Sequence, residues 1–344
     1  MKVTAIWVYP IKALRGIRLD SAHLSPQGVQ YDRRFIICRA QADGELVKVQ
    51  TDKNPECSLF SQEIVGDMLH VRYLTPIEPL IPRRPEHDVV LQVPLEPDIS
   101  TLSRVVVNLH RSMVNAYSMG PSYDEWFSAC FGFQVTFIYI GDGRRPVLGT
   151  YSPRTLPDTP QKGWLATLSG YLGSDGARPE PDWIAFSDLA PYLVTSEQSL
   201  HNVSARLENG PMEMHKFRPN IVVDGEGCDA FDEDLWAELS MDGKPIFALT
   251  KLCNRCNSIN VNYDTGRLAE GDRGIVLKKL MSDRRIDPGY KWGPTFGKYT
   301  FLANGIDGLN LSVGDELFVT KRQTEIPVTD WPMTKEGARF YRYT

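Results

Sequence analysis

Short segments with a β-strand pattern of hydrophobic and polar residues recur along most of the chain. Residues 3–9 are apolar and β-prone, residues 35–38 form a continuous apolar run, and residues 68–73 alternate between apolar and polar side chains. Alternation with a period of two is typical of a strand that buries one face. Further strands are predicted at residues 46–49, 135–140, 221–225, 246–249, 259–263, 299–302 and 316–319.

Two segments carry apolar residues at helical spacing. Ser122 is expected to cap a helix that buries Trp126. Thr195 or Ser196 is expected to cap a second helix, which ends where Asn209 and Gly210 follow each other. Many short strands with few helices indicate a mixed α/β, β-rich fold, in which a barrel-like β domain carries helical decoration.

Residues 141–182 differ from the rest of the chain in composition. They hold 7 Gly and 6 Pro in 42 positions, about twice the density of the whole sequence. Such a segment cannot sustain a long helix or a central strand, so it is predicted to be an inter-domain loop with one short helix near residues 164–172. The loop divides the chain into an N-terminal β-rich domain at residues 1–140 and a second domain at residues 183–344, which includes a short C-terminal extension. We expect the loop to shape access to a site between the two domains.

Length and charge exclude several classes of protein. The chain has 344 residues, enough for about two domains. It carries 38 basic and 43 acidic side chains, a net charge of −5, which disfavours general nucleic-acid binding. No run approaches the roughly 18–20 apolar residues of a membrane helix. The 6 cysteines form no disulfide framework in a chain this long, so a reducing, cytoplasmic location is expected.

The sharpest local signal is the pair Cys253 and Cys256, which flank Arg255. A structural zinc site would need two more ligands, and no second pair of this kind exists. A redox pair should open a helix, whereas a strand is predicted to follow here. Two interpretations stay open from the spacing: two buried thiols, or a thiolate that Arg255 stabilises as a ligand for a soft or high-valent metal.

Other polar residues lie where predicted strands begin or end. Arg218 and Lys12 are candidate phosphate ligands, although a surface arginine more commonly pairs with a carboxylate and a lone lysine after a strand is more commonly solvated. The Ser-Asp pair at residues 187–188 can accept hydrogen bonds from a ring N–H or make a turn. The arginine pairs at residues 144–145 and 284–285 are expected to be solvated. The sequence contains no P-loop, dinucleotide-binding glycine motif, nucleophile elbow or zinc-protease motif.

Five short motifs stand in order along the chain. Residues 9–12 read Tyr-Pro-Ile-Lys and residues 32–35 read Asp-Arg-Arg-Phe. Residues 186–188 read Phe-Ser-Asp, residues 217–220 read Phe-Arg-Pro-Asn, and residues 253–256 read Cys-Asn-Arg-Cys. In order and spacing this set resembles the MOSC-domain family of molybdenum enzymes across nearly the whole chain. Within this family the set resembles the mitochondrial amidoxime-reducing component and its bacterial relatives, which reduce N-hydroxylated compounds.

The resemblance implies a MOSC β-barrel domain, a smaller N-terminal β-rich domain and a molybdenum–molybdopterin cofactor. Cys256 would be the protein thiolate on molybdenum, and Cys256 and Asp188 would be the catalytic residues. The cofactor-binding residues that it implies come from both domains: Lys12, Ala13, Arg33, Ser187, Asp188, Arg218, Asn220, Arg255 and Cys256. Several cations in one set suit a dianionic phosphate, for which a single basic side chain is too weak.

The implied reaction is a two-electron reduction of an N-hydroxylated or N-oxide compound with removal of its oxygen. No flavin, haem or iron–sulfur motif is present, so the electrons must come from a partner. In relatives this donor is a b5-type cytochrome with its reductase, or a ferredoxin-like protein. The mitochondrial relatives carry a membrane anchor before the first strand. This sequence begins at the strand, so no membrane span is expected.

Four positions depart from the family pattern. Ala13 stands where relatives usually have serine, Leu189 and Ala190 replace hydroxyl residues, and Asn262 replaces an aspartate. Each lost hydroxyl removes a hydrogen bond worth roughly 0.5–1.5 kcal/mol. Two other functions therefore stay open. One is a cofactor carrier or sulfur-transfer protein that needs no electron donor, and the other is a degenerate or specialised biosynthetic MOSC protein.

Overall fold

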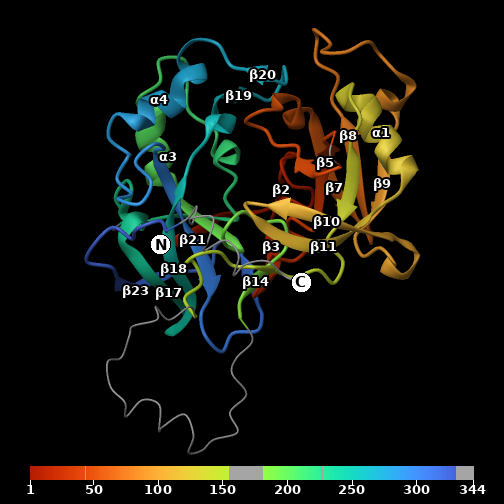
Figure 1. The fold of residues 1–344 in the computed structure, drawn as a ribbon. Coiled ribbons are helices and arrows are strands. Elements are labelled where there is room, and N and C mark those ends of the chain that lie inside the picture. Colours follow the sequence, from red (N-terminus) through yellow and green to blue (C-terminus); the bar gives the residue numbers. More distant parts are fainter. Residues whose placement is uncertain (43, 155–180, 226–227, 331–344) are drawn as a thin grey trace, which may run out of the picture.

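The computed structural model describes residues 1–42, 44–154, 181–225 and 228–330. The two halves of the chain lie side by side, the red-to-yellow half with helix α1 and the green-to-blue half with helices α3 and α4 (Figure 1). The α-helices of the described residues are α1 (Pro121–Phe131), α3 (Glu197–Ser204) and α4 (Val276–Met281). In the described part of the chain, no helix has the length and apolar character needed to cross a bilayer.

The C-terminal half, residues 181–330, is built on an eight-stranded sheet that also includes two strands from the start of the chain. Its order is β2 (Ile17–Leu19), β1 (Lys2–Val8), β16 (Ile221–Asp224), β15 (Tyr192–Ser196), β21 (Thr295–Leu302), β18 (Lys244–Asn254), β17 (Trp236–Met241) and β23 (Phe318–Arg322). A three-stranded sheet accompanies it, in the order β22 (Leu309–Ser312), β3 (Ser21–Ser25) and β4 (Gly28–Val29). Two short strands, β19 (Val261–Asn262) and β20 (Arg267–Leu268), pair with each other.

The N-terminal half contains two further sheets. One has the order β10 (Ser103–Leu109), β11 (Ser112–Ser118), β12 (Thr136–Tyr139), β5 (Phe35–Ala40) and β6 (Leu46–Lys48). The other consists of β7 (Phe60–Val65), β8 (Met68–Tyr73) and β9 (Leu91–Pro94). Helix α1 packs Trp126 and Phe127 against Phe60 and Phe137, which gives this half an aromatic core.

The first strand of the chain belongs to the sheet of the C-terminal half. Strand β1 pairs antiparallel with β16, and β3 pairs with β22 near the other end of the chain. The sheets therefore do not divide the sequence at one point. Because β1 ends at Val8, the segment that follows it leaves the C-terminal sheet and enters the N-terminal half. This crossing brings residues 9–14 to the junction where both halves meet.

Most predicted elements are confirmed, with three differences. The first helix begins at Pro121 after Gly120, since proline is favoured in the first helical turn, and not at Ser122. Ser196 does cap α3, because its Oγ accepts a hydrogen bond from Ser199 N. This helix, however, ends at Ser204 and not near Asn209. The strand predicted at residues 259–263 is confirmed only as β19 (Val261–Asn262), because a 3-10 helix takes up Asn257–Asn260 before it.

The Gly/Pro-rich segment is described only at its two ends. Strand β13 (Arg145–Pro146) pairs with β14 (Trp183–Ile184) across it. Residues 155–180, including the short helix predicted near 164–172, lie outside the described residues. The remaining 3-10 helices are η1 (Pro55–Leu59), η2 (Pro85–Asp88), η3 (Ile99–Thr101), η4 (Met214–Phe217), η5 (Asp232–Leu235), η6 (Asn257–Asn260) and η7 (Gly271–Ile275).

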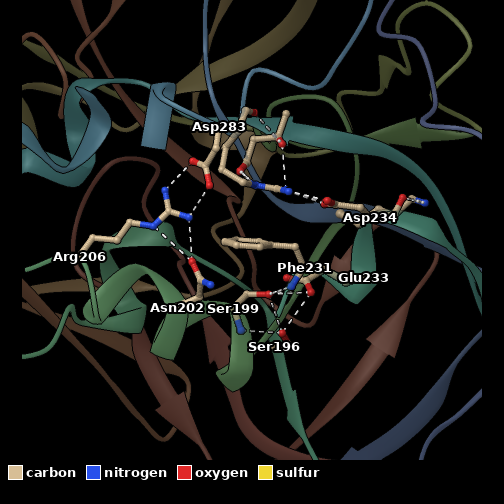
Figure 2. Close-up of polar contacts among 11 residues, drawn as sticks. Ser196, Ser199, Asn202, Arg206, Phe231, Glu233, Asp234 and Asp283 are labelled. Carbon is tan, nitrogen blue, oxygen red and sulfur yellow. Dashed lines mark hydrogen bonds and ion pairs between the residues drawn. The ribbon is translucent and has the colours of Figure 1, made fainter. Parts of the chain in front are cut away.

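A buried polar cluster joins α3 to η5 (Figure 2). Glu233 is fully buried and accepts hydrogen bonds from Ser196 Oγ (3.1 Å) and Ser199 Oγ (2.8 Å). Beside it, Arg284 forms a buried ion pair with Asp234 at 2.7 Å. The prediction that Arg284 is solvated is therefore wrong, because a buried carboxylate compensates its charge.

The burial of Glu233 makes the stability of the protein pH-dependent. Burial and the charge of Asp234 raise the pKa of Glu233 to about 7, although its serine hydrogen bonds oppose this. The folded state therefore holds this proton more tightly than the unfolded state, in which the pKa of glutamate is about 4.3. Glu233 stabilises the fold at low pH, and this contribution is lost as the pH rises through about 7.

Glu233→Gln should remove this pH dependence, because glutamine cannot lose the proton. The wild type loses stability as Glu233 ionises, whereas the variant does not. The free energy of unfolding of the variant minus that of the wild type should therefore increase by up to about 3 kcal/mol between pH 4.5 and pH 8. Urea unfolding across this range measures the difference. Glu63→Gln, at an exposed position on β7, is the matched control. A constant difference between Glu233→Gln and the wild type at every pH would contradict the prediction.

Candidate functional site

A cavity of about 610 Å³ opens between the two halves of the molecule. It is lined by residues that lie more than 200 positions apart in the sequence, such as Lys12 and Cys256. All nine residues proposed from the sequence resemblance line it: Lys12, Ala13, Arg33, Ser187, Asp188, Arg218, Asn220, Arg255 and Cys256. The fold thus brings the five motifs to one place, and the chemical role of each residue stays a prediction.

Cys256 presents a thiol to this cavity. It is exposed, whereas the other cysteines are all buried, and every cysteine is a free thiol. Strand β18 ends at Asn254, and Cys256 is the residue before η6, with its Sγ 3.2 Å from Ser258 Oγ. A thiol must be reachable to ligate a metal or react. Cys256 is the cysteine that meets this condition.

Arg255 is held beside this thiol by contacts on two sides. Its Nη1 donates to Cys253 Sγ at 2.9 Å, and its Nη2 donates to Phe217 O at 2.8 Å. Burial disfavours the charge of Arg255, but the sulfur atoms of Cys253 and Cys256 outweigh burial and raise its pKa. Its Nε is buried without a hydrogen-bond partner among the described residues. A buried unpaired donor at a cavity wall is a donor available to a ligand.

Two other guanidinium groups share one aromatic ring. Arg33 and Arg218 each lie with Cζ 4.3 Å from the ring centroid of Tyr9, an arrangement that favours cation–π attraction. Arg33 is fixed by Asp32 (2.5 Å) and Asn220 Oδ1 (3.1 Å). Gly16 packs on the same ring, since a Cβ there would lie 2.5 Å from Tyr9 Cε1. The two guanidinium planes are thus preorganised before any ligand arrives.

The backbone is strained where these residues meet. Ala13, Arg33 and Arg218 adopt positive φ angles of 75°, 48° and 56°. For residues other than glycine this conformation costs about 1 kcal/mol or more each. Strain of this kind persists where the surrounding structure fixes it, and it clusters at functional sites. The same three residues line the cavity.

A charged network crosses the cavity at Lys12. Its Nζ donates to Phe186 O at 2.7 Å and to Asp188 Oδ1 at 2.6 Å. His110 Nε2 lies 3.0 Å from the same carboxylate oxygen. Burial lowers the pKa of Lys12 to about 7, with Asp188 opposing, and burial lowers the pKa of His110 to about 4. Desolvation by the surrounding protein opposes ionisation of Asp188, but Lys12 and His110 hold its pKa well below the usual value, so Asp188 is ionised.

Arg145 positions the chain segment that carries Ser187 and Asp188. This arginine is fully buried and donates to three backbone carbonyls, Ala185 O (3.1 Å), Ser187 O and Asp188 O (2.8 Å). The prediction that Arg145 is solvated is therefore wrong. A Gly/Pro-rich segment with two adjacent arginines has the composition of a surface loop. Nothing in that composition indicates that Arg145 is buried.

Several cavity residues carry no motif and were missed. Lys48, His110 and Arg111 come from the N-terminal half. Tyr151 and Tyr299 also line the cavity and meet edge-to-face with ring centroids 5.6 Å apart. The alternating pattern marks Tyr299 as a strand residue but does not show which surface it faces.

The donor set fits the molybdenum–molybdopterin cofactor that the sequence resemblance implies. A metal-bound thiolate needs the reachable sulfur that Cys256 provides. A phosphate needs convergent cations, and Arg33 and Arg218 lie on one ring. Polar ring atoms need donors, and Ser187 Oγ is a second buried polar atom without a partner among the described residues. The replacements Leu189 and Ala190 also line the cavity, so neither of these two positions offers it a hydroxyl group.

Comparisons with known proteins agree with this picture. The family model of the MOSC N-terminal beta barrel domain matches residues 1–134, and that of the MOSC domain matches residues 181–318. The chain is 27% identical to human mitochondrial amidoxime-reducing component 1 over 325 residues, which cover 92% of this chain and 82% of that protein. It is 28% identical to human mitochondrial amidoxime reducing component 2 over 328 residues, with the same coverage.

A second group of similar proteins consists of molybdenum cofactor sulfurases. The molybdenum cofactor sulfurase of Oryza sativa subsp. japonica is 24% identical over 291 residues. The match covers 82% of this chain but 30% of the sulfurase, which is a much longer protein. Similarity of both kinds therefore extends over both halves of the chain.

Proposed function

This chain belongs to the MOSC-domain family, and on that premise we propose that it is a molybdenum-cofactor-dependent oxidoreductase. Its substrates are small N-hydroxylated or N-oxide compounds, from which it removes oxygen in a two-electron reduction. The observation that carries the proposal is the convergence of one reachable thiol, Cys256, with Arg33 and Arg218 in a single cavity. Similarity to the amidoxime-reducing components over 92% of the chain supports the reductive direction.

The residues of the cavity divide the work of holding the cofactor. Cys256 Sγ is the metal ligand, and the guanidinium groups of Arg33 and Arg218 bind the phosphate. Ser187 Oγ and Arg255 Nε, both buried without partners among the described residues, hydrogen-bond the pterin. Asn220 keeps Arg33 in place through its Oδ1, and Ala13 contributes only its backbone, because it has no hydroxyl group. When bound, the cofactor supplies the two-electron chemistry.

Converting an N–OH group into N–H and water consumes two electrons and two protons. Asp188 is ionised, so it acts as a hydrogen-bond acceptor in the cavity and not as the acid. Lys12 Nζ, whose pKa lies at about 7, holds a proton that can be given up near neutral pH. The ion pair with Asp188 keeps this proton at the cavity wall. Lys12 therefore joins Cys256 and Asp188 among the residues proposed to act on the substrate.

The electrons come from a separate donor protein, either a b5-type cytochrome with its reductase or a ferredoxin-like protein. The two protein components meet at the open side of the cavity. The free state of all the cysteines supports a reducing compartment such as the cytoplasm.

A carrier or sulfur-transfer role is the second candidate, and similarity to the molybdenum cofactor sulfurase favours it. In that role the exposed Cys256 would hold a persulfide or release the cofactor, and no electron donor would be needed. The two candidates differ in whether external electrons are consumed.

Turnover with a reduced dye separates them. Protein from a host that makes the cofactor is mixed with dithionite-reduced methyl viologen and benzamidoxime, and dye oxidation is followed together with the product amidine. We expect the dye to be oxidised and the amidine to form, with two electrons taken from the dye for each amidine molecule. Dye that stays reduced with fully loaded protein would reject the reductase and favour the carrier.

A further inference from the structure

One tight turn at the cavity has residues that its backbone disfavours. Strands β10 and β11 pair up to Leu109 and Ser112, so His110 and Arg111 form a two-residue hairpin turn. Their φ angles are 57° and 67°, both in the left-handed region. Two-residue turns with two positive φ angles strongly favour Asn-Gly or Asp-Gly.

The same chain uses the favoured residues at a turn away from the cavity. Strands β17 and β18 pair up to Met241 and Lys244, and the turn between them is Asp242-Gly243, with φ angles of 51° and 74°. The β7–β8 turn also carries a glycine, Gly66, at its positive φ. The exception is the turn that reaches the cavity. Strain kept at one turn and avoided at an equivalent one indicates that His110 and Arg111 are retained for their side chains.

Both side chains face the cavity beside further charges. His110 and Arg111 line it together with Lys48, whose Nζ lies 3.2 Å from His110 Nε2. Among the described residues no carboxylate forms an ion pair with Lys48. Asp188, the nearby carboxylate, is already engaged by Lys12 and His110.

The cavity as a whole has an excess of positive charge. Among the described residues, two carboxylates line it, Asp52 and Asp188. From the same part of the chain, six lysine and arginine side chains line it: Lys12, Arg33, Lys48, Arg111, Arg218 and Arg255. Arg33 and Arg218 form one group on Tyr9, and Lys48 with the turn forms another around Asp188. A low-dielectric cavity lined with one sign of charge attracts ligands of the opposite sign.

We propose that Lys48 and the His110–Arg111 turn form an anion subsite of this cavity, separate from the guanidinium pair on Tyr9. The subsite takes a phosphate or carboxylate group. That group belongs either to the cofactor, as a phosphate beyond the one bound by the guanidinium pair, or to an anionic substrate. This assignment deepens the proposed function and rests on it for the identity of the ligand, but not for the existence of the subsite.

Phosphate binding to the cofactor-free chain tests the subsite without any turnover. Titration calorimetry with inorganic pyrophosphate is expected to show two binding events. The double variant His110→Asn with Arg111→Gly, and separately Lys48→Gln, should weaken the same event at least tenfold. Arg218→Ala should weaken the other. A single event that Arg218→Ala abolishes and the turn variants leave unchanged would overturn the proposal.

Thermal unfolding distinguishes loss of charge from loss of structure. Asn-Gly relieves the strained turn, so the double variant should melt about 2–4 °C above the wild type while binding pyrophosphate less well. Lys48→Gln should bind pyrophosphate less well than the wild type without an increase in melting temperature. Asp242→Asn, in the equivalent turn away from the cavity, is the control for both measurements. A double variant that is less stable and binds pyrophosphate as the wild type does would contradict the assignment.

Repeating the titration with the loaded chain identifies the source of the anion. Loss of the turn-dependent event on loading assigns the subsite to the cofactor. Its persistence assigns it to the substrate, and the turn variants should then raise KM for an N-hydroxylated carboxylate but not for its uncharged analogue. If the chain binds no metal at all, the proposed function fails, and the pyrophosphate titration still decides whether the subsite exists.

Discussion

Cys256→Ala is expected to reduce N-reductive turnover more than about 100-fold, while Cys253→Ser leaves it within a few-fold of the wild type. Removing a group that hydrogen-bonds to a metal ligand lowers metal affinity or activity about 10–100-fold, and removing the protein ligand itself lowers them further. Cys256 carries the exposed thiol, whereas Cys253 is buried and accepts a hydrogen bond from Arg255. Serine at position 253 keeps an acceptor for that guanidinium group. Steady-state kinetics with matched metal content measure the effect.

The two alanine variants separate this account from a dithiol site. Cys253→Ala leaves Arg255 without its sulfur acceptor and should cost stability, about 1.5–3 kcal/mol for a bond to a charged group. It should nevertheless retain the metal. Equal loss of metal from Cys253→Ala and Cys256→Ala would show that both sulfurs are ligands and would reject the single-thiolate assignment.

Arg218→Ala is expected to lower the affinity for the cofactor about 10–100-fold, a larger effect than the one on the stability of the chain. A charge-assisted hydrogen bond contributes about 1.5–3 kcal/mol, and each 1.4 kcal/mol is a factor of ten. Arg218 donates to Leu14 O at 2.6 Å, so one intramolecular bond is lost as well. The ratio of bound pterin to protein after dialysis, beside the melting temperature, measures both effects.

Two further substitutions control for charge and geometry. Arg218→Lys keeps the positive charge but not the planar fork, so its occupancy should lie between those of alanine and arginine. Arg285→Ala removes an exposed arginine elsewhere and should change neither quantity. Full occupancy in Arg218→Ala would show that the phosphate lies away from Tyr9 and would overturn the assignment of the guanidinium pair.

Sequence patterns were sufficient for most of the strands, whereas the convergence of the motifs follows only from the family resemblance. The continuous apolar run at residues 35–38 lies in β5 and the alternating run at 68–73 lies in β8, because both patterns are local properties of the chain. Arg218 and Cys256 were placed together through their resemblance to family motifs, and the structure brings both to one cavity. Nothing in their own spacing of 38 residues indicates that they share a cavity.

What the sequence did not show depends on tertiary packing. Arg145 and Arg284 are buried because carbonyl groups and a carboxylate from distant segments surround them. The alternation at residues 259–263 begins in a 3-10 helix that buries Ile259 and continues into the short strand β19, and the pattern alone does not show where one gives way to the other. The His110–Arg111 turn has no turn signature, because its residues are unfavourable for the backbone that they adopt. Functional strain of this kind runs against the rules by which turns are predicted.

The most direct test of the central claim is the metal and pterin content of the full chain, purified from a host that makes the molybdenum cofactor. Wild-type protein and Cys256→Ala are measured side by side by elemental analysis and by fluorescence of the oxidised pterin. The account predicts about one molybdenum and one pterin per wild-type chain, and metal loss or altered metal coordination in Cys256→Ala. Zinc, or no metal and no pterin, in wild-type protein from that host would contradict it.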